Sequence, residues 1–284
     1  MVETPGSWLE FVNAGFKPYR KIKHSIYDYL PNYQPLQDTK IAPIVLSNHC
    51  SWFEIFAHWQ ENISFLAKSS TSDTPFVGTL VLAKQMVYIT SHTEEGRKET
   101  DRRLKERLKK NMEGKLPQIN VYPEGTLNNS ETILKFKKGG FDHTYPIRIR
   151  CSRFFQDGYL SPSFVNMNAY TFMLLWLSIP SFFSEFYEIE EHVDPLYLLK
   201  KNNVDPESPD AWKVVAKEVK DIMTFMTGMF GSEQGYAELL EYEKSEIFVK
   251  DTMGGTFMRR TGCTSKRDSH HPSNLQSKDK IKTN

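Results

Sequence analysis

Short apolar runs alternate with charged, helix-forming stretches along the middle of the chain. Residues 97–112 are highly charged but place Leu104, Leu108 and Met112 at a spacing of four, which is typical of a helix with one narrow apolar face. The apolar runs have the length and composition of buried strands and cover residues 44–46, 63–67, 86–89, 119–122 and 146–149. This alternation predicts an α/β fold, a single domain with a central mostly parallel or mixed sheet flanked by helices.

The second half of the chain continues the pattern. Residues 185–191 alternate well enough for one more strand, and Ser208 and Pro209 can be the N-cap and first residue of a helix. The apolar side chains of that helix predict its buried face: Trp212, Val215, Val219, Ile222 and Met226. Residues 170–183 are strongly apolar, but Pro180 leaves less than the roughly 20 residues of a membrane span. They form either a buried helix or a helix lying in the membrane interface.

The two ends differ from the middle. Aromatic and basic side chains mix in residues 8–33, which suits an anionic membrane surface as well as an ordinary solvated helix. The chain loses periodicity from about residue 250 and becomes polar, which predicts a disordered tail. We therefore expect a membrane-facing segment over residues 1–40, a folded domain over 41–249 and a tail over 250–284.

Composition and charge exclude several classes of protein. The net charge of +1 lacks the basic excess of a nucleic-acid-binding surface, so we expect no nucleic-acid partner. Three cysteines give neither a disulfide framework nor a paired metal motif, so we expect a reducing compartment and no metal. A mean hydropathy of −0.51 is that of a soluble or peripheral protein. Residues 1–10 do not resemble a signal peptide.

A histidine follows the first predicted strand, in the segment NHCSWFE over residues 48–54. His49 can take a proton from an attacking hydroxyl at neutral pH. It does so better when a carboxylate such as Glu54 holds its other ring nitrogen and stabilises the imidazolium. Residues 51–54 also read as a capping box, in which Glu54 only caps the next helix.

A second candidate motif follows the strand predicted over residues 119–122. Its sequence is Tyr122-Pro123-Glu124-Gly125-Thr126. A turn of this kind can expose backbone N–H groups and a carboxylate to a pocket, although it is also an ordinary tight turn.

Taken together, the two motifs resemble the glycerolipid acyltransferase family. NHCSWFE resembles the H-x4-D block, and VYPEGT resembles the proline-glutamate-glycine-threonine block that follows about 70 residues later. The stretch GKLPQINVYPEGTLNNSETILKFKKGGF is most similar to the lysophosphatidylcholine and lysophospholipid acyltransferase branch. The resemblance covers residues 43–150 and implies that residues 41–249 are an acyltransferase domain.

The resemblance implies an enzyme of phospholipid biosynthesis that esterifies a lysophospholipid hydroxyl with an acyl group from acyl-CoA. His49 is then the general base and Glu54, in place of the family's aspartate, its partner. No cofactor is implied, since acyl-CoA is a co-substrate and no acyl-enzyme forms. Backbone N–H groups near Gly125 or in the His49 loop would stabilise the oxyanion. The implied location is the cytosolic face of the endoplasmic reticulum membrane.

The remaining site residues are also implied by the resemblance. Arg97 stands nearest the family's arginine block and could bind phosphate, or simply begin a solvated helix. The basic run of Lys135, Lys137 and Lys138 could also contact phosphate, or it could be a solvated run. The acceptor pocket would be shaped by the second motif: Tyr122, Pro123, Glu124, Gly125 and Thr126.

The sequence departs from the family at two positions that bear on activity. Glu54 is one methylene longer than the expected aspartate, and Ser91 stands where the branch places an arginine. Both departures favour an alternative, a non-catalytic lipid- or membrane-binding relative on the same fold. A third reading is a hydrolase in which Cys50, beside His49, is the nucleophile, although no G-x-S-x-G motif is present.

Overall fold

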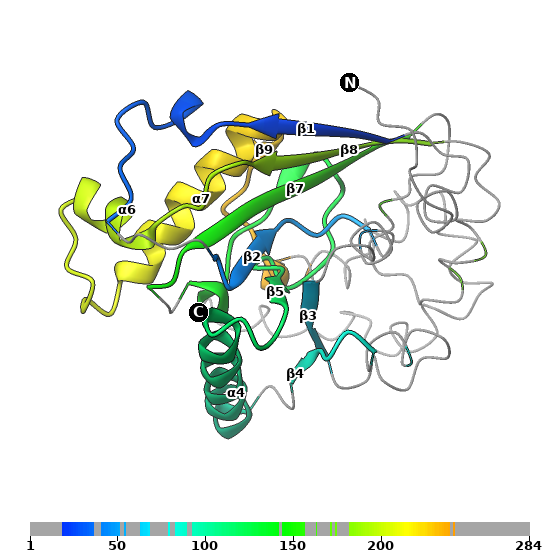
Figure 1. Ribbon diagram of the computed structural model, residues 1–284. Helices are drawn as coiled ribbons and strands as arrows, with labels where there is room; N and C mark the ends of the chain where they lie inside the picture. The colour runs from blue at the N-terminus through cyan, green and yellow to red at the C-terminus, as the bar shows by residue number, and fades with distance from the viewer. Residues whose placement is uncertain are drawn as a thin grey trace, which may run out of the picture. The chain divides into compact units, whose positions relative to one another are not determined.

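The computed structural model describes residues 19–36, 41–51, 54, 63–68, 79, 83–89, 93–141, 144–156, 163, 171, 174, 182–238 and 241. A seven-stranded sheet has the strand order β1-β8-β7-β2-β5-β3-β4 (Figure 1). Its strands are β1 (Tyr19–His24), β2 (Ile44–Ser47), β3 (Ile63–Lys68), β4 (Val87–Ile89), β5 (Gln118–Val121), β7 (Ile147–Gln156) and β8 (Phe182–Ile189). Among these pairings β7 with β8 is antiparallel and the others are parallel, so the sheet is mixed and mostly parallel, as predicted.

Helices pack against this sheet. In Figure 1, α7 lies along β7 and α4 stands beside β4 and β5. The apolar face predicted for α7 is buried at Val215, Val219 and Ile222, and the apolar stripe of α4 is buried at Leu104 and Leu108. The helices and the smaller elements are α4 (Glu94–Met112), α6 (Pro195–Lys201), α7 (Ala211–Thr227), η1 (Ile26–Asp28), η3 (Lys138–Gly140) and the paired short strands β6 (Thr132–Ile133) and β9 (Phe230–Gly231).

Local sequence explains where the long helices begin and end. The Thr93 hydroxyl caps α4 by accepting the Gly96 N–H, and α7 ends at Gly228, whose φ of 65° is the left-handed conformation that glycine adopts readily. The start predicted for α7 at Ser208 is wrong. The Ser208 carbonyl accepts the Ala211 N–H in a separate turn, so the helix begins at Ala211.

Two strands differ from the sequence prediction because their extent depends on a partner strand. β7 continues to Gln156, since it pairs with β8 up to that residue. The aromatic and basic residues 19–24 form β1, which pairs with β8 at the edge of the sheet rather than forming a helix (Figure 1). The core between sheet and helices contains as its largest fully buried side chains Ile26, Ile44, Leu46, Ile63, Leu104, Leu108, Ile119, Ile133, Ile147, Ile149 and Ile189.

Several predictions fall outside the described residues. They include the tail over 250–284, and the apolar segment 170–183 except for Thr171, Leu174 and the start of β8. Within the described part, no helix has both the length and the apolar character needed to cross a membrane. The elements above lie in the compact unit of residues 1–233, and the domain boundaries inferred from sequence stay predictions.

Candidate active site

His49 stands just beyond the carboxyl end of β2, and sites in open α/β sheets commonly lie beyond the carboxyl ends of the strands. Its Nδ1 atom lies 2.7 Å from Oε2 of Glu54. The Glu54 side chain is 1% exposed, whereas that of His49 is 20% exposed and open to a substrate. A carboxylate on Nδ1 holds the proton there, which leaves Nε2 unprotonated in the neutral ring.

The carboxylate of Glu54 has two further donors. Its Oε1 atom accepts the backbone N–H of Cys50 at 2.7 Å and the hydroxyl of Ser152. The structure therefore brings the two sequence-predicted residues together and gives Glu54 contacts beyond those of a helix cap. The extra methylene of the glutamate does not prevent the contact with His49.

Ser152 lies in β7 and was missed by sequence analysis. The side chain of Asn48 holds it, because the amide oxygen accepts the Ser152 N–H and the amide nitrogen donates to the Ser152 carbonyl, both at 2.8 Å. Ser152 lies 98 residues from Glu54 in the sequence. Ser152 stands between Cys151 and Arg153, beyond the strand predicted over residues 146–149, so no local pattern marked it.

Glu124 supports the backbone of the His49 loop. It is fully buried, and its carboxylate accepts the His49 N–H at 2.9 Å, the Leu134 N–H at 2.8 Å and the Asn128 side-chain amide at 2.9 and 3.0 Å. The backbone N–H of Asn128 donates in turn to the His49 carbonyl at 2.7 Å. Burial raises the pKa of Glu124 to about 7, although the hydrogen bonds from these donors act to lower it.

Of the rest of the second motif, Tyr122 contacts the histidine ring. The Tyr122 ring stacks on the His49 ring with centroids 3.9 Å apart, and burial raises the pKa of Tyr122 well above its usual value. Gly125 has a φ of 66°, and the side chain of Lys137 lies close over it. Pro123 is buried and Thr126 half-buried, and the Pro123 carbonyl accepts the Lys137 N–H at 2.8 Å.

The oxyanion donors expected near these motifs are already engaged. The N–H groups of His49 and Cys50 donate to the buried carboxylates, and that of Gly125 donates to the Tyr122 carbonyl at 3.1 Å. These three N–H groups are therefore engaged in this arrangement, and the expectation of an oxyanion donor near Gly125 or in the His49 loop stays a prediction for the other N–H groups there.

Cys50 is not placed as a nucleophile. Its side chain is fully buried, and burial, followed by the nearby carboxylates of Glu54 and Glu124, raises the pKa of its thiol well above the ordinary value. A neutral buried thiol lacks both the charge and the access that nucleophilic catalysis needs. The hydrolase reading thereby loses its candidate residue.

The basic residues proposed for phosphate do not converge. Arg97 is exposed in the first turn of α4, and among the described contacts none joins it to the motif residues. Lys135 is exposed and lies near Glu233, Lys137 lies over Gly125, and Lys138 lines a separate cavity. Ser91 lies outside the described residues.

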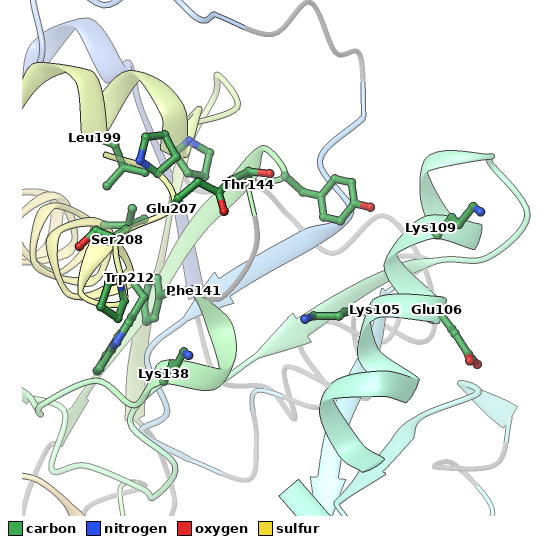
Figure 2. A pocket seen from close by; sticks show the side chains of 16 residues that line it. Lys105, Glu106, Lys109, Lys138, Phe141, Thr144, Leu199, Glu207, Ser208 and Trp212 are labelled. Carbon is green, nitrogen blue, oxygen red and sulfur yellow. The ribbon is translucent and has the colours of Figure 1, made fainter. Parts of the chain in front are cut away.

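That cavity, of about 720 Å³, lies between α4, η3 and the start of α7 (Figure 2). Figure 2 shows Lys105 and Lys109 on the α4 side and Trp212 with Phe141 on the other. Its lining also includes Glu106 and Glu207, so its charges are mixed, and it contains no residue of the two motifs. No group of side chains suited to a metal ion occurs in the part of the chain that the structure describes.

Comparisons with known proteins agree with the motifs. Residues 21–149 match the family model described as Acyltransferase, which confirms the predicted resemblance over these residues. A lysophospholipid acyltransferase of Arabidopsis thaliana is 34% identical over 110 residues, which are 38% of this chain and 20% of the relative. Lysophosphatidylcholine acyltransferase 1 of Homo sapiens is 31% identical over 110 residues, 39% of this chain and 20% of the relative.

Two further comparisons extend over more of the chain. A lysophosphatidylcholine acyltransferase of Drosophila melanogaster is 26% identical over 203 residues, 71% of this chain and 36% of the relative. The crystal structure of the 1-acyl-sn-glycerophosphate acyltransferase PlsC of Thermotoga maritima is 18% identical, with a TM-score of 0.38 and 73% coverage of both chains. The chain thus spans between a fifth and about a third of the length of these curated relatives.

Proposed function

From the acyltransferase-family match over residues 21–149, we propose that this protein transfers an acyl group from acyl-CoA to the hydroxyl of a lysophospholipid. The observation that carries the proposal is the contact of His49 Nδ1 with the buried Glu54 carboxylate at 2.7 Å. The names of the relatives, which are lysophospholipid and lysophosphatidylcholine acyltransferases, favour this class of acceptor.

In the proposed reaction, the hydroxyl oxygen of the acceptor attacks the carbonyl carbon of the thioester. At the same time Nε2 of His49 accepts the proton of that hydroxyl. The carbon–sulfur bond then breaks, and the proton passes to the leaving thiolate of coenzyme A. Glu54 stabilises the imidazolium that exists between these two steps, because its negative charge lies against Nδ1. The products are the esterified phospholipid and free coenzyme A.

The proposal assigns Glu124 a role behind the histidine. Its carboxylate accepts the His49 N–H, and the Asn128 N–H donates to the His49 carbonyl, so the backbone is fixed on both sides of the histidine. Such fixing matters, because a misplacement of about 1 Å can cost about a hundredfold in rate. We also propose that the protein acts at a membrane surface, the cytosolic face of the endoplasmic reticulum, where lysophospholipid acceptors reside.

The test is acyl transfer from labelled acyl-CoA to a panel of lysophospholipids and glycerol 3-phosphate supplied in vesicles. We expect transfer by the wild type to at least one lysophospholipid and a loss of about a thousandfold or more in His49→Ala, because the general base and its positioning are removed together. His24→Ala is the matched control, since His24 is a half-buried histidine in the edge strand β1.

Two results would contradict the proposal. Equal activity of wild type and His49→Ala would remove the histidine from the mechanism. A folded wild type that transfers to no acceptor would favour the alternative of a non-catalytic, lipid-binding relative, which binding to lysophospholipid vesicles without turnover would then identify.

A further inference from the structure

The carboxylate of Glu54 is held by a hydroxyl from a strand that carries neither sequence motif. Ser152 lies in β7, and its Oγ atom donates to Oε1 of Glu54. Both side chains are buried, with 3% of Ser152 and 1% of Glu54 exposed. A buried carboxylate must be hydrogen-bonded by the protein, because water cannot reach it.

The two oxygens of Glu54 have different partners. Oε1 accepts the Cys50 N–H and the Ser152 hydroxyl, whereas Oε2 faces Nδ1 of His49. Donors from two directions on Oε1 fix the plane of the carboxylate, and that plane decides where Oε2 points. A glutamate needs such fixing more than an aspartate does, because it has one more rotatable bond between the backbone and the carboxylate.

We propose that Ser152 is a positioning residue of the acyltransferase site, which fixes the Glu54 side chain so that Oε2 holds His49 in the catalytic tautomer. This inference rests on the proposed function. It also accounts for the departure at Glu54, because a longer carboxylate side chain is usable where a second strand anchors it.

The position of Ser152 is itself fixed by the first motif. The Asn48 side chain bonds both the N–H and the carbonyl of Ser152 and so continues the parallel pairing of β2 with β7 beyond Ser47 and Arg150. Asn48 is fully buried, so no water competes for these bonds. The backbone that carries the hydroxyl is therefore held beside the carboxylate by the Asn48 side chain and by the strand pairing that precedes it.

The experiment is a double-mutant cycle in the acyl-transfer assay, with wild type, Ser152→Ala, Glu54→Ala and the double variant. Ser152→Ala removes only the hydroxyl, and we expect kcat to fall about tenfold with KM within about twofold of wild type, because a lost bond to a charged partner weakens positioning and not substrate binding. In the Glu54→Ala background the same substitution should have almost no further effect on kcat.

The matched control is Ser64→Ala in β3. Ser64 is fully buried and its hydroxyl donates to the Gln85 carbonyl at 2.9 Å, so the substitution removes a buried hydroxyl bond of similar kind away from Glu54. Its effect on kcat should be small, and the same in both backgrounds. Ser152→Thr, which keeps the hydroxyl, should recover much of the kcat lost in Ser152→Ala.

The outcomes separate this inference from the proposed function. If His49→Ala loses transfer but Ser152→Ala keeps an unchanged kcat, the role of Ser152 alone is overturned. The same holds if Ser152→Ala has an equal effect in both Glu54 backgrounds. If the wild type transfers nothing, the ¹⁵N NMR shifts of the His49 ring decide. We expect a dominant Nδ1–H tautomer in wild type and Ser64→Ala and a reduced fraction in Ser152→Ala, and no change would overturn the inference.

Discussion

At the scale of single residues, Gly125 combines a backbone conformation that favours glycine with a close neighbouring side chain. Its φ of 66° lies in the left-handed region, which L-residues with a Cβ atom adopt at a cost. A Cβ atom on this residue would lie 2.5 Å from Nζ of Lys137. The tip of the lysine can move away, so the backbone conformation is the stricter requirement.

We therefore predict that Gly125→Ala lowers the free energy of unfolding by about 1–2 kcal/mol, the cost of a left-handed conformation for a residue with a Cβ atom. Urea denaturation measures the change. Gly139→Ala is the control, because no atom lies within 4 Å of the corresponding Cβ position and the backbone there is not left-handed. A loss in the control as large as that in Gly125→Ala would show that the loop, and not the φ angle, responds.

The raised pKa of Glu124 leads us to predict that the stability of the protein depends on pH. Its pKa is raised by burial to about 7 in the folded protein, from an ordinary value of 4.5. Between these values the folded protein binds more protons than the unfolded chain, so the contribution of this group to stability falls as the pH rises from about 4.5 to about 7 and is constant above. We measure the free energy of unfolding of wild type and of Glu124→Gln at pH 5 and pH 8. The wild-type value minus the variant value should be larger at pH 5 than at pH 8. A difference larger at pH 8 would contradict the raised pKa.

The site residues that sequence could identify are those whose partners are near in the chain. His49 and Glu54 lie five residues apart, so a strand-to-helix turn was enough to predict their contact. Asn128 and Ser152 acquire their roles only when β2, β5 and β7 have paired, and a pattern within one segment carries no trace of such pairing. The acceptor of the His49 N–H is likewise hidden from the local pattern, since Glu124 lies 75 residues away.

At the scale of elements, the sequence likewise predicted features that depend on a local pattern and missed those that depend on a distant partner. The long helices were predicted because their apolar stripes are periodic, and β2, β3 and β4 because each contains a short, mostly apolar run. β1 is different, because its residues are aromatic and basic and it becomes a strand only through β8, whose Glu185 forms an ion pair with Arg20. The Glu191 carboxylate then accepts the N–H of Ile26 at 2.7 Å, which fixes the chain where β1 ends.

We predict that removal of residues 1–24 destabilises the protein, because β8 loses the strand that pairs with it over six residues and its edge becomes exposed. Urea denaturation should show a lower midpoint, and the variant should aggregate at concentrations where the wild type does not. A variant lacking residues 1–18 keeps β1 and is the control. Equal stability of both variants would favour the reading of residues 1–40 as a segment independent of the fold.

At the scale of the whole molecule, the candidate active site is assembled by the sheet and not by any one segment. His49 follows β2, the carboxylate behind it follows β5, and the hydroxyl on Glu54 comes from β7. Parallel strands cannot be joined by tight hairpins, so these three contributions are separated by long stretches of chain. The central order β7-β2-β5 brings them to one edge.

The pairing of Asn48 with Ser152 has a consequence for folding during synthesis on the ribosome. Its two members lie 104 residues apart, so the ribosome must have synthesised the chain through β7 before the Asn48 amide can bind its partner. Until then the side chain of Asn48 lacks its partner in β7, and Glu54 lacks the hydrogen bond from Ser152. The candidate site is therefore expected to form only after β7 has emerged and paired with β2.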